Sequence, residues 1–258
     1  MDAKTPKNRK SSSDGVTGNV KDLRNTIEWL QDEGDLIETT IEVNPDLEIV
    51  ALQKHLDGSC PILFENVAEK SNHRVITNLF GDINVIDKMF GWKDGTDRTR
   101  KLAYALSHPL KPAEIPQDEA PSQHTVIEKP ENVNDYMVPI RHTEYEPELT
   151  VGSGIRVVTG KYFDDGTDLG YNRMNFRWGN VGTFQISPGS HMWQVASKFY
   201  KEDEPVPITM CFGVPPSCTL MAGAGFDYAI LPQGCDEIGI AGAGQGEPVR
   251  LVKARTVD

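Results

Sequence analysis

Apolar residues follow helical and strand spacing in turn along the first hundred residues. Apolar side chains at positions 23, 27 and 30 mark one face of a helix that ends at Gly34. Asn44-Pro45 predicts the start of a second helix, with Asn44 as its cap. The other elements predicted here are strands at 37–43, 61–67 and 74–79 and helices from 45 to about 57, at 83–90 and at 97–107. This alternation predicts a small α/β layer.

Strand-like patterns dominate after a proline-rich segment. Residues 109–121 carry four prolines and several acidic residues, which predicts a surface linker without secondary structure. The elements predicted beyond it are strands at 123–127, 154–163, 170–178, 181–186 and 208–212, a hairpin turn at 163–167 and a helix at 191–201. Many strands with close turn signals predict a barrel or a strongly curved sheet.

These patterns predict an α+β protein with four segments. Residues 1–18 are polar, basic and rich in serine, which predicts a disordered tail. A small α/β domain at 19–108, the linker at 109–121 and a strand-rich domain at 122–258 follow.

Composition narrows the class of protein. The net charge of −12 over 258 residues argues against nucleic acid as the main partner. The four cysteines show no zinc spacing and no disulfide-framework density, which favours free thiols in a reducing compartment. No apolar run is long enough to cross a membrane and no signal-peptide core is present, so we expect a cytoplasmic protein without a membrane partner.

Candidate metal ligands flank and follow the strand pattern at 170–178. Asp168 precedes it, His191 follows a turn-rich Ser-Pro-Gly-Ser, and Glu237 lies downstream. Oxygen and nitrogen donors of this kind suit a divalent metal of the Mn or Mg type. Their spacing is not compact, so solvated loop residues are the alternative interpretation.

Other chemistry-bearing residues leave their alternatives open. Arg173 on the predicted strand either projects inward as a fork for a carboxylate or phosphate, or lies on the surface of an edge strand. The glycine-rich runs 221–226 and 241–246 fit neither a dinucleotide fingerprint nor a phosphate-binding loop, which favours tight packing of small residues. His124 and His142 are interpreted as structural or solvent-facing.

Seven segments stand in order between Val20 and Asp258: DLRNTIEWLQDEGDLIETTIEVNPDLEI, ILFENV, VITNLFGD, LGYNRMNF, SPGSHMWQ, PITMCFGVPP and LPQGCDEIGIAGAGQGEPVRLVKARTVD. In sequence and order they resemble UbiD-like decarboxylases. Members of this family bind prenylated FMN and reversibly decarboxylate aromatic, heteroaromatic or α,β-unsaturated acids. The resemblance therefore implies a carboxy-lyase acting on a small carboxylic acid.

The resemblance also implies roles for individual residues. A divalent metal, usually Mn²⁺ with Mg²⁺ as the alternative, holds the cofactor's phosphate through Asp168, His191 and Glu237, with K⁺ nearby. Asp168 departs from the asparagine common in the family and adds a negative charge. Arg173 orients the substrate carboxylate near the reactive flavin edge. The residues implied to line or hold the cofactor are Gly170, Tyr171, Asn172, Arg173, Ser190, His191, Ile230, Leu231 and Glu237.

The same resemblance implies a split β-barrel like that of flavin reductases for residues 122–258. In the family, a strand with two glutamates and a C-terminal domain follow the position of Asp258. We therefore expect a fragment or one subunit of a split enzyme, completed by a C-terminal half or partner subunit, and a homo-oligomer. A non-catalytic flavin-binding or scaffold subunit is the alternative, and an NAD(P)H:FMN reductase sharing only the barrel is a third hypothesis. The acid and the direction of the reaction stay open.

Overall fold

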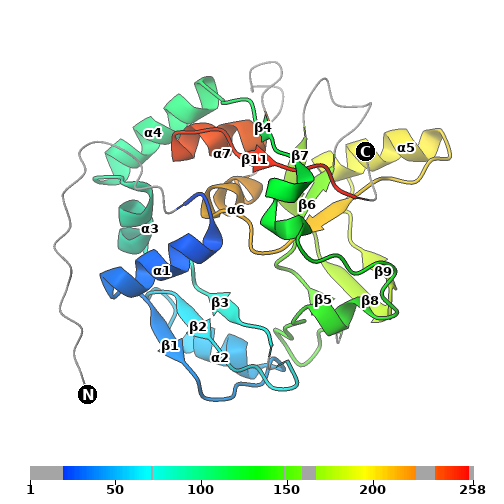
Figure 1. The fold of residues 1–258 in the computed structure, drawn as a ribbon, viewed down its shortest axis with the longest axis horizontal. Helices are drawn as coiled ribbons and strands as arrows, with labels where there is room; N and C mark the ends of the chain where they lie inside the picture. The colour runs from blue at the N-terminus through cyan, green and yellow to red at the C-terminus, as the bar shows by residue number, and fades with distance from the viewer. Residues whose placement is uncertain (1–19, 71, 148, 159–166, 225–235, 256–258) are drawn as a thin grey trace.

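The computed structural model describes residues 20–70, 72–147, 149–158, 167–224 and 236–255 (Figure 1). The helices within these ranges are α1 (Leu23–Glu33), α2 (Glu48–His55), α3 (Ile83–Phe90), α4 (Gly95–Ser107), α5 (His191–Lys201), α6 (Pro216–Ala222) and α7 (Glu237–Gln245). Outside the described residues lie the predicted tail, residues 163–166 of the hairpin turn predicted at 163–167, Ile230 and Leu231.

The strands form several small sheets. They are β1 (Ile37–Thr39), β2 (Ile62–Phe64), β3 (Val75–Thr77), β4 (Ala113–Glu114), β5 (Thr150–Val151), β6 (Ile155–Val158), β7 (Asp168–Tyr171), β8 (Met174–Trp178), β9 (Val181–Phe184), β10 (Thr209–Cys211) and β11 (Arg250–Leu251). The sheet orders are β1-β2-β3, β10-β6-β7, β5-β8-β9 and β11-β4. The mixed α and β content confirms the predicted class, while the described strands close no barrel.

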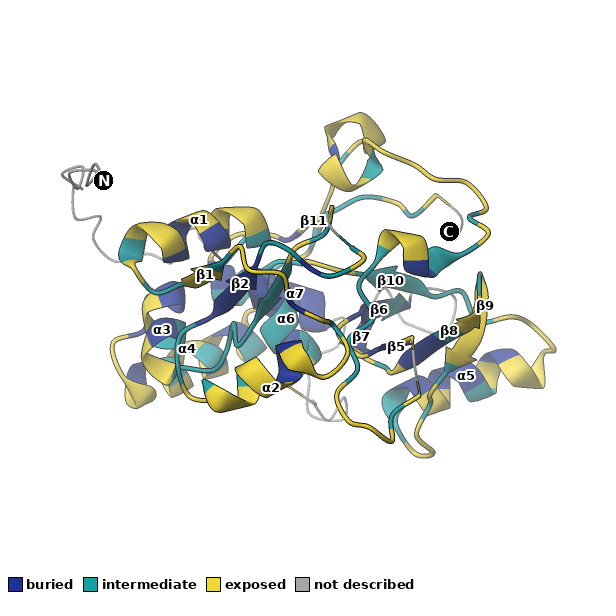
Figure 2. Cartoon of the chain, turned by 90° about the horizontal axis from the view of Figure 1, so that it is seen from below, coloured by how far each residue is buried: buried dark blue, intermediate teal, exposed yellow. Residues whose placement is uncertain are grey.

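The N-terminal part packs helices against the β1-β2-β3 sheet. Asp22 caps α1 by accepting from two backbone amides, and Gly34 ends it in the left-handed conformation with φ 75°. The ends of α3 also agree with the prediction, because Asp82 caps it and Gly91 terminates it. Strand β2 is buried throughout, and Figure 2 shows it in dark blue between the more exposed turns of α1 and α2. These helices and this sheet supply the mixed α and β content of the N-terminal part.

The predicted start of the second helix is wrong. Helix α2 begins at Glu48, because Leu47 takes a positive φ of 69° that no helix continues through. Asn44 instead closes a turn, in which its side-chain oxygen accepts from the amide of Asp46 at 2.8 Å. Strand β1 is also shorter than predicted, and Ile41 beyond it is 78% exposed.

Three predictions in the second half are corrected. The predicted strand 170–178 is two strands in different sheets, β7 beside β6 and β8 between β5 and β9, with Asn172 and Arg173 at the break. Residues 123–127 form no strand: Gln123 ends a 3₁₀ turn, and Val126 and Ile127 are exposed. The proline-rich segment contains β4, which pairs in parallel with β11, so it is not free of secondary structure.

The glycine-rich run 241–246 lies largely in α7, a helix that the sequence did not predict. Small residues let neighbouring chain approach this helix, since a Cβ on Gly242 would lie 3.3 Å from the Glu247 carbonyl oxygen. Ile238, Ile240 and Ala241 are buried in a core cluster with Ile155, Leu169 and Met221. Tight packing therefore explains Gly242, whereas Gly246 ends the helix in the left-handed conformation with φ 81°. None of the helices in the described ranges has the length and apolar character needed to span a membrane.

Candidate functional site

Strand β7 carries the first candidate ligand into the interior. Its antiparallel register with β6 sets Val158 opposite Asp168 and Arg156 opposite Gly170. Asp168 is 1% exposed. A carboxylate so deeply buried needs compensating partners, because an isolated charge is poorly tolerated in the interior.

Arg156 supplies one of these partners. Its guanidinium forms an ion pair with the Asp168 carboxylate, and Nη1 also donates to the Asp168 carbonyl oxygen at 3.2 Å. Its Nε donates to Asn172 Oδ1 at 2.5 Å. The arginine side chain is 7% exposed, so this is a buried charge-assisted network.

His191 supplies the second partner from another element. It is the first residue of α5, whose cap is Ser190, and the Ser190 hydroxyl oxygen accepts from the amide of Trp193 at 3.1 Å. Apolar residues of α5, Met192, Val195 and Phe199, pack in a cluster with Val158 and hold the helix against the sheet. This packing places His191 Nδ1 2.7 Å from Asp168 Oδ1.

Helix α7 brings the third candidate ligand to the same strand. Its cap, Asp236, accepts from the Gly239 amide at 2.6 Å and from the Thr167 hydroxyl at 2.9 Å, which ties the helix to the residue before β7. Glu237, next in the chain, is 5% exposed. Its Oε2 accepts from the Leu169 amide at 3.4 Å. The three predicted ligands thus meet around β7.

The electrostatics favour an ionised Asp168. Burial by itself raises the pKa of this carboxyl, but the hydrogen bond with His191 and the charge of Arg156 outweigh it, so the pKa lies below its ordinary value. Oxygen and nitrogen donors of this type suit Mn²⁺ or Mg²⁺. As arranged, however, no three His, Cys, Asp or Glu side chains of the described ranges form a group that could hold a metal ion. The donors fit a metal in kind but not in their present arrangement, since Arg156 and His191 engage the two Asp168 oxygens.

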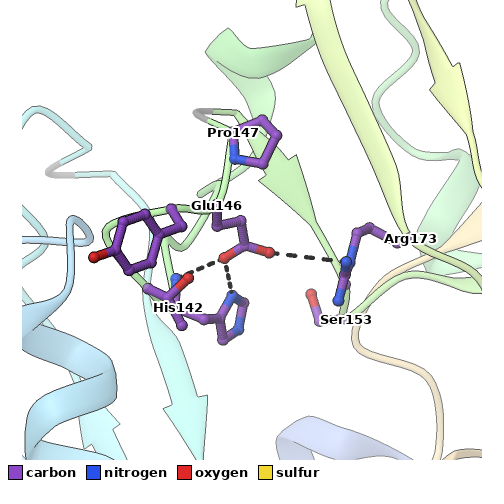
Figure 3. A pocket seen from close by; sticks show the side chains of 8 residues that line it. His142, Glu146, Pro147, Ser153 and Arg173 are labelled. Atoms are coloured by element: carbon purple, nitrogen blue, oxygen red, sulfur yellow. Dashed lines mark hydrogen bonds and ion pairs between the residues drawn. The ribbon is translucent and has the colours of Figure 1, made fainter.

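Arg173 lies elsewhere, at the break between β7 and β8. Its side chain is 62% exposed and lines a pocket of about 690 Å³. Glu146 faces it, with Oε1 4.0 Å from Arg173 Nε (Figure 3). His142 fixes this glutamate through its backbone amide at 2.7 Å and its Nδ1 at 2.9 Å. The pocket therefore presents a guanidinium and a carboxylate side by side.

The remaining predicted cofactor residues lie around the same two strands. Gly170 lies under the Arg156 guanidinium, and Asn172 lies between Arg156 and Gln185, whose carbonyl oxygen accepts from Asn172 at 2.7 Å. The Tyr171 hydroxyl donates to the Thr219 carbonyl oxygen at 3.2 Å. Their roles, and those of Ser190, Ile230 and Leu231, stay predictions.

Sequence reasoning missed Arg156 and Glu146. The only signal for Arg156 was a charged residue inside an otherwise apolar strand, Ile155–Val158. Glu146 gave no signal, because it lies in an irregular acidic segment whose path is set by contacts with Arg173 and His142. His142, interpreted as structural or solvent-facing, is half exposed and holds Glu146.

Two family models match the chain. Residues 27–106 match the N-terminal domain of the 3-octaprenyl-4-hydroxybenzoate carboxy-lyases, and residues 113–258 match the Rift-related domain of the same enzymes. Together they take in most of the sequence. The chain therefore belongs to the UbiD family of carboxy-lyases, as the ordered sequence segments predicted.

Individual relatives agree with this assignment. Gallate decarboxylase of Lactiplantibacillus plantarum is 27% identical over 255 residues, which are 92% of this chain and 51% of that enzyme. Phenolic acid decarboxylase of Sedimentibacter hydroxybenzoicus is 28% identical over 261 residues, with the same shares covered. An evolved dimeric form of the UbiD-class enzyme HmfF from Pelotomaculum thermopropionicum, solved with prenylated FMN, superposes with a TM-score of 0.82 at 27% identity, over 92% of this chain and 54% of that one. The chain spans about half the length of the curated relatives it matches.

Proposed function

We propose that this chain provides the cofactor-binding part of a prenylated-FMN-dependent enzyme that reversibly decarboxylates an aromatic, heteroaromatic or α,β-unsaturated carboxylic acid. The observation that carries the proposal is the superposition on a prenylated-FMN complex over 92% of the chain. Two of its relatives are named gallate decarboxylase and phenolic acid decarboxylase, which supports the reaction class. The sheets β10-β6-β7 and β5-β8-β9 are then the split β-barrel of a flavin-binding domain.

The cofactor site in this proposal centres on β7. In this site a divalent cation, Mn²⁺ or Mg²⁺, would be held by Asp168, His191 and Glu237 and would neutralise the cofactor's phosphate, and K⁺ would be a further cation. Their convergence on one strand supports the assignment, since Asp168 and His191 are in contact and Glu237 accepts from Leu169. Cation binding then requires Asp168 to give up part of its present contacts.

Prenylated FMN, when bound, supplies a sink for the electron pair left behind as a carboxylate departs as CO₂. The protein's own part is to place the acid. The exposed Arg173 guanidinium offers two parallel donors to a substrate carboxylate and lines the pocket where such a group has room. Glu146 and His142 contact each other and line the same pocket opposite that arginine.

The matched relatives extend well beyond the region they share with this chain. We propose that groups from that other half, in the same chain or a partner subunit, complete the site and supply the proton. A homo-oligomer in the cytoplasm is the assembly and location we expect. A flavin-binding subunit without catalytic activity of its own is the alternative.

Co-production with a prenyl-FMN synthase, followed by assays of CO₂ release and of labelled CO₂ exchange on a panel of aromatic and acrylic acids, tests this function. We expect bound flavin and exchange with at least one acid, and a loss of about 100-fold in the Arg173→Met variant. Arg177→Met, an exposed arginine on β8, is the matched control and retains activity. Bound flavin without exchange favours the binding subunit, while absence of both contradicts the proposal.

A further inference from the structure

Arg156 is a buried cation within the proposed cation site. The strand that carries it is otherwise apolar, and its neighbours Ile155 and Val158 are buried in two core clusters. A long charged side chain at such a position normally extends to solvent. Here it turns inward, and all three of its described acceptors belong to β7 or to the residue just after it.

Gly170 makes this path available. It pairs directly with Arg156 across the two strands, and a Cβ there would lie 2.9 Å from Arg156 Nη2. With no side chain in the way, the guanidinium lies over the strand and reaches the two diagonal neighbours, Asp168 on one side and Asn172 on the other. The glycine and the arginine are thus one structural unit.

The charges around β7 show what this unit does. Asp168 and Glu237 place two buried carboxylates at the strand, and Asp236 lies next in the chain, bound to Thr167. Among the described residues, Arg156 forms an ion pair with one oxygen of Asp168, and His191 contacts the other oxygen of that carboxylate. The guanidinium therefore engages the same carboxylate that is proposed to bind the metal.

We propose that Arg156 is a fixed counter-charge that opposes divalent metal binding at this site. Its positive charge is paired with Asp168 and reduces the negative charge that an arriving metal ion meets. This inference rests on the metal assignment in the proposed function. It predicts an effect of opposite sign to a purely structural role, because removing a structural arginine weakens metal binding whereas removing a competing cation tightens it.

The test is a titration of the 258-residue chain with Mn²⁺ alone, following the electron paramagnetic resonance signal of free Mn²⁺. We expect Arg156→Met to bind Mn²⁺ roughly tenfold more tightly than the wild type, because a like charge in contact with a ligand is removed. Arg98→Met is the matched control: Arg98 is also partly buried, pairs with Asp87 at 3.4 Å and lies on α4, so Mn²⁺ affinity stays unchanged.

A second background keeps the inference testable if Arg156→Met does not fold. The comparison is between Asp168→Asn and the double variant Asp168→Asn/Arg156→Met. The double variant lacks both charges of the ion pair, so no unpaired charge is left buried. We expect it to bind Mn²⁺ more tightly than Asp168→Asn does. Equal or weaker binding on loss of Arg156 in a folded protein overturns the inference while leaving the metal site intact. A wild-type chain and variants that bind no Mn²⁺ contradict the metal assignment itself.

Discussion

Asp168 and His191 meet side chain to side chain, with Asp168 Oδ1 2.7 Å from His191 Nδ1. One residue opens β7 and the other opens α5, so the contact joins a buried strand to a helix that packs on the same sheet. A carboxylate hydrogen-bonded to Nδ1 fixes the orientation of an imidazole ring. The contact therefore brings two of the three proposed metal ligands together.

Loss of the Asp168 carboxylate should be costly. Asp168→Ala leaves the buried Arg156 without its counter-ion, and we expect the free energy of unfolding to fall by about 3–5 kcal/mol. Asp46→Ala removes an exposed partner of Arg141 and should cost less than about 1 kcal/mol. Chemical denaturation of both variants measures the difference, and equal costs would show that the Asp168 pair is not a buried network.

A methyl group at Gly170 should disturb the same network. The Cβ of Gly170→Ala meets Arg156 Nη2 at 2.9 Å, so the guanidinium must move from its acceptors, at an expected cost of about 1–3 kcal/mol. Gly152→Ala is the control, because a Cβ there meets nothing within 4 Å. Thermal unfolding compares the two. If Gly170→Ala is as stable as Gly152→Ala, the arginine does not depend on this glycine.

Glu146 should compete with an acid substrate for Arg173. Glu146→Gln removes the negative charge that lies 4.0 Å from the guanidinium, so we expect the KM of an acid substrate to fall about two- to fivefold. Glu144→Gln, a neighbouring exposed carboxylate, leaves KM unchanged. Steady-state kinetics of the cofactor-loaded enzyme provide the measurement. A rise in KM would mean that Glu146 orients Arg173 rather than competing for it.

Asp97 should make the fold sensitive to acid. The hydrogen bond from Arg100 and the backbone amide of Lys93 lower the pKa of this carboxyl to about 2 from an ordinary value of 3.8. A folded-state pKa below the unfolded one stabilises the fold above about pH 4, and that contribution disappears as pH falls toward 2. Asp97→Asn should flatten the dependence of unfolding free energy on pH over this window. An unchanged slope in the variant contradicts this assignment.

Local signals in the sequence were sufficient for some elements and not for others. Helix α3 spans its predicted residues and ends before Gly91, and α5 begins at its predicted residue, whereas the cap predicted at Asn44 begins no helix. Long-range contacts decided the failures. The strand predicted at 170–178 breaks because Asn172 is held by Arg156 and Gln185, and α7 escaped prediction because its glycines disfavour a helix until neighbours pack against them.

The residues of the candidate site were also predicted only in part. The sequence named Asp168, His191 and Glu237 together, and the structure brings all three to β7. The sequence did not reveal that Arg156 lies among them. That contact depends on the register of β6 with β7 and on the absence of a Cβ at Gly170. The pairing of β6 with β7 therefore adds the positive charge of Arg156 to this site, and no local sequence pattern shows that pairing.

Flavin binding with and without metal tests the claim that a cation on Asp168, His191 and Glu237 anchors the cofactor's phosphate. FMN fluorescence titrated with the 258-residue chain should show saturable binding with Mn²⁺, and at least about tenfold weaker binding after chelation or in Glu237→Gln. Binding of equal strength with and without Mn²⁺, or no binding at all, would contradict the claim.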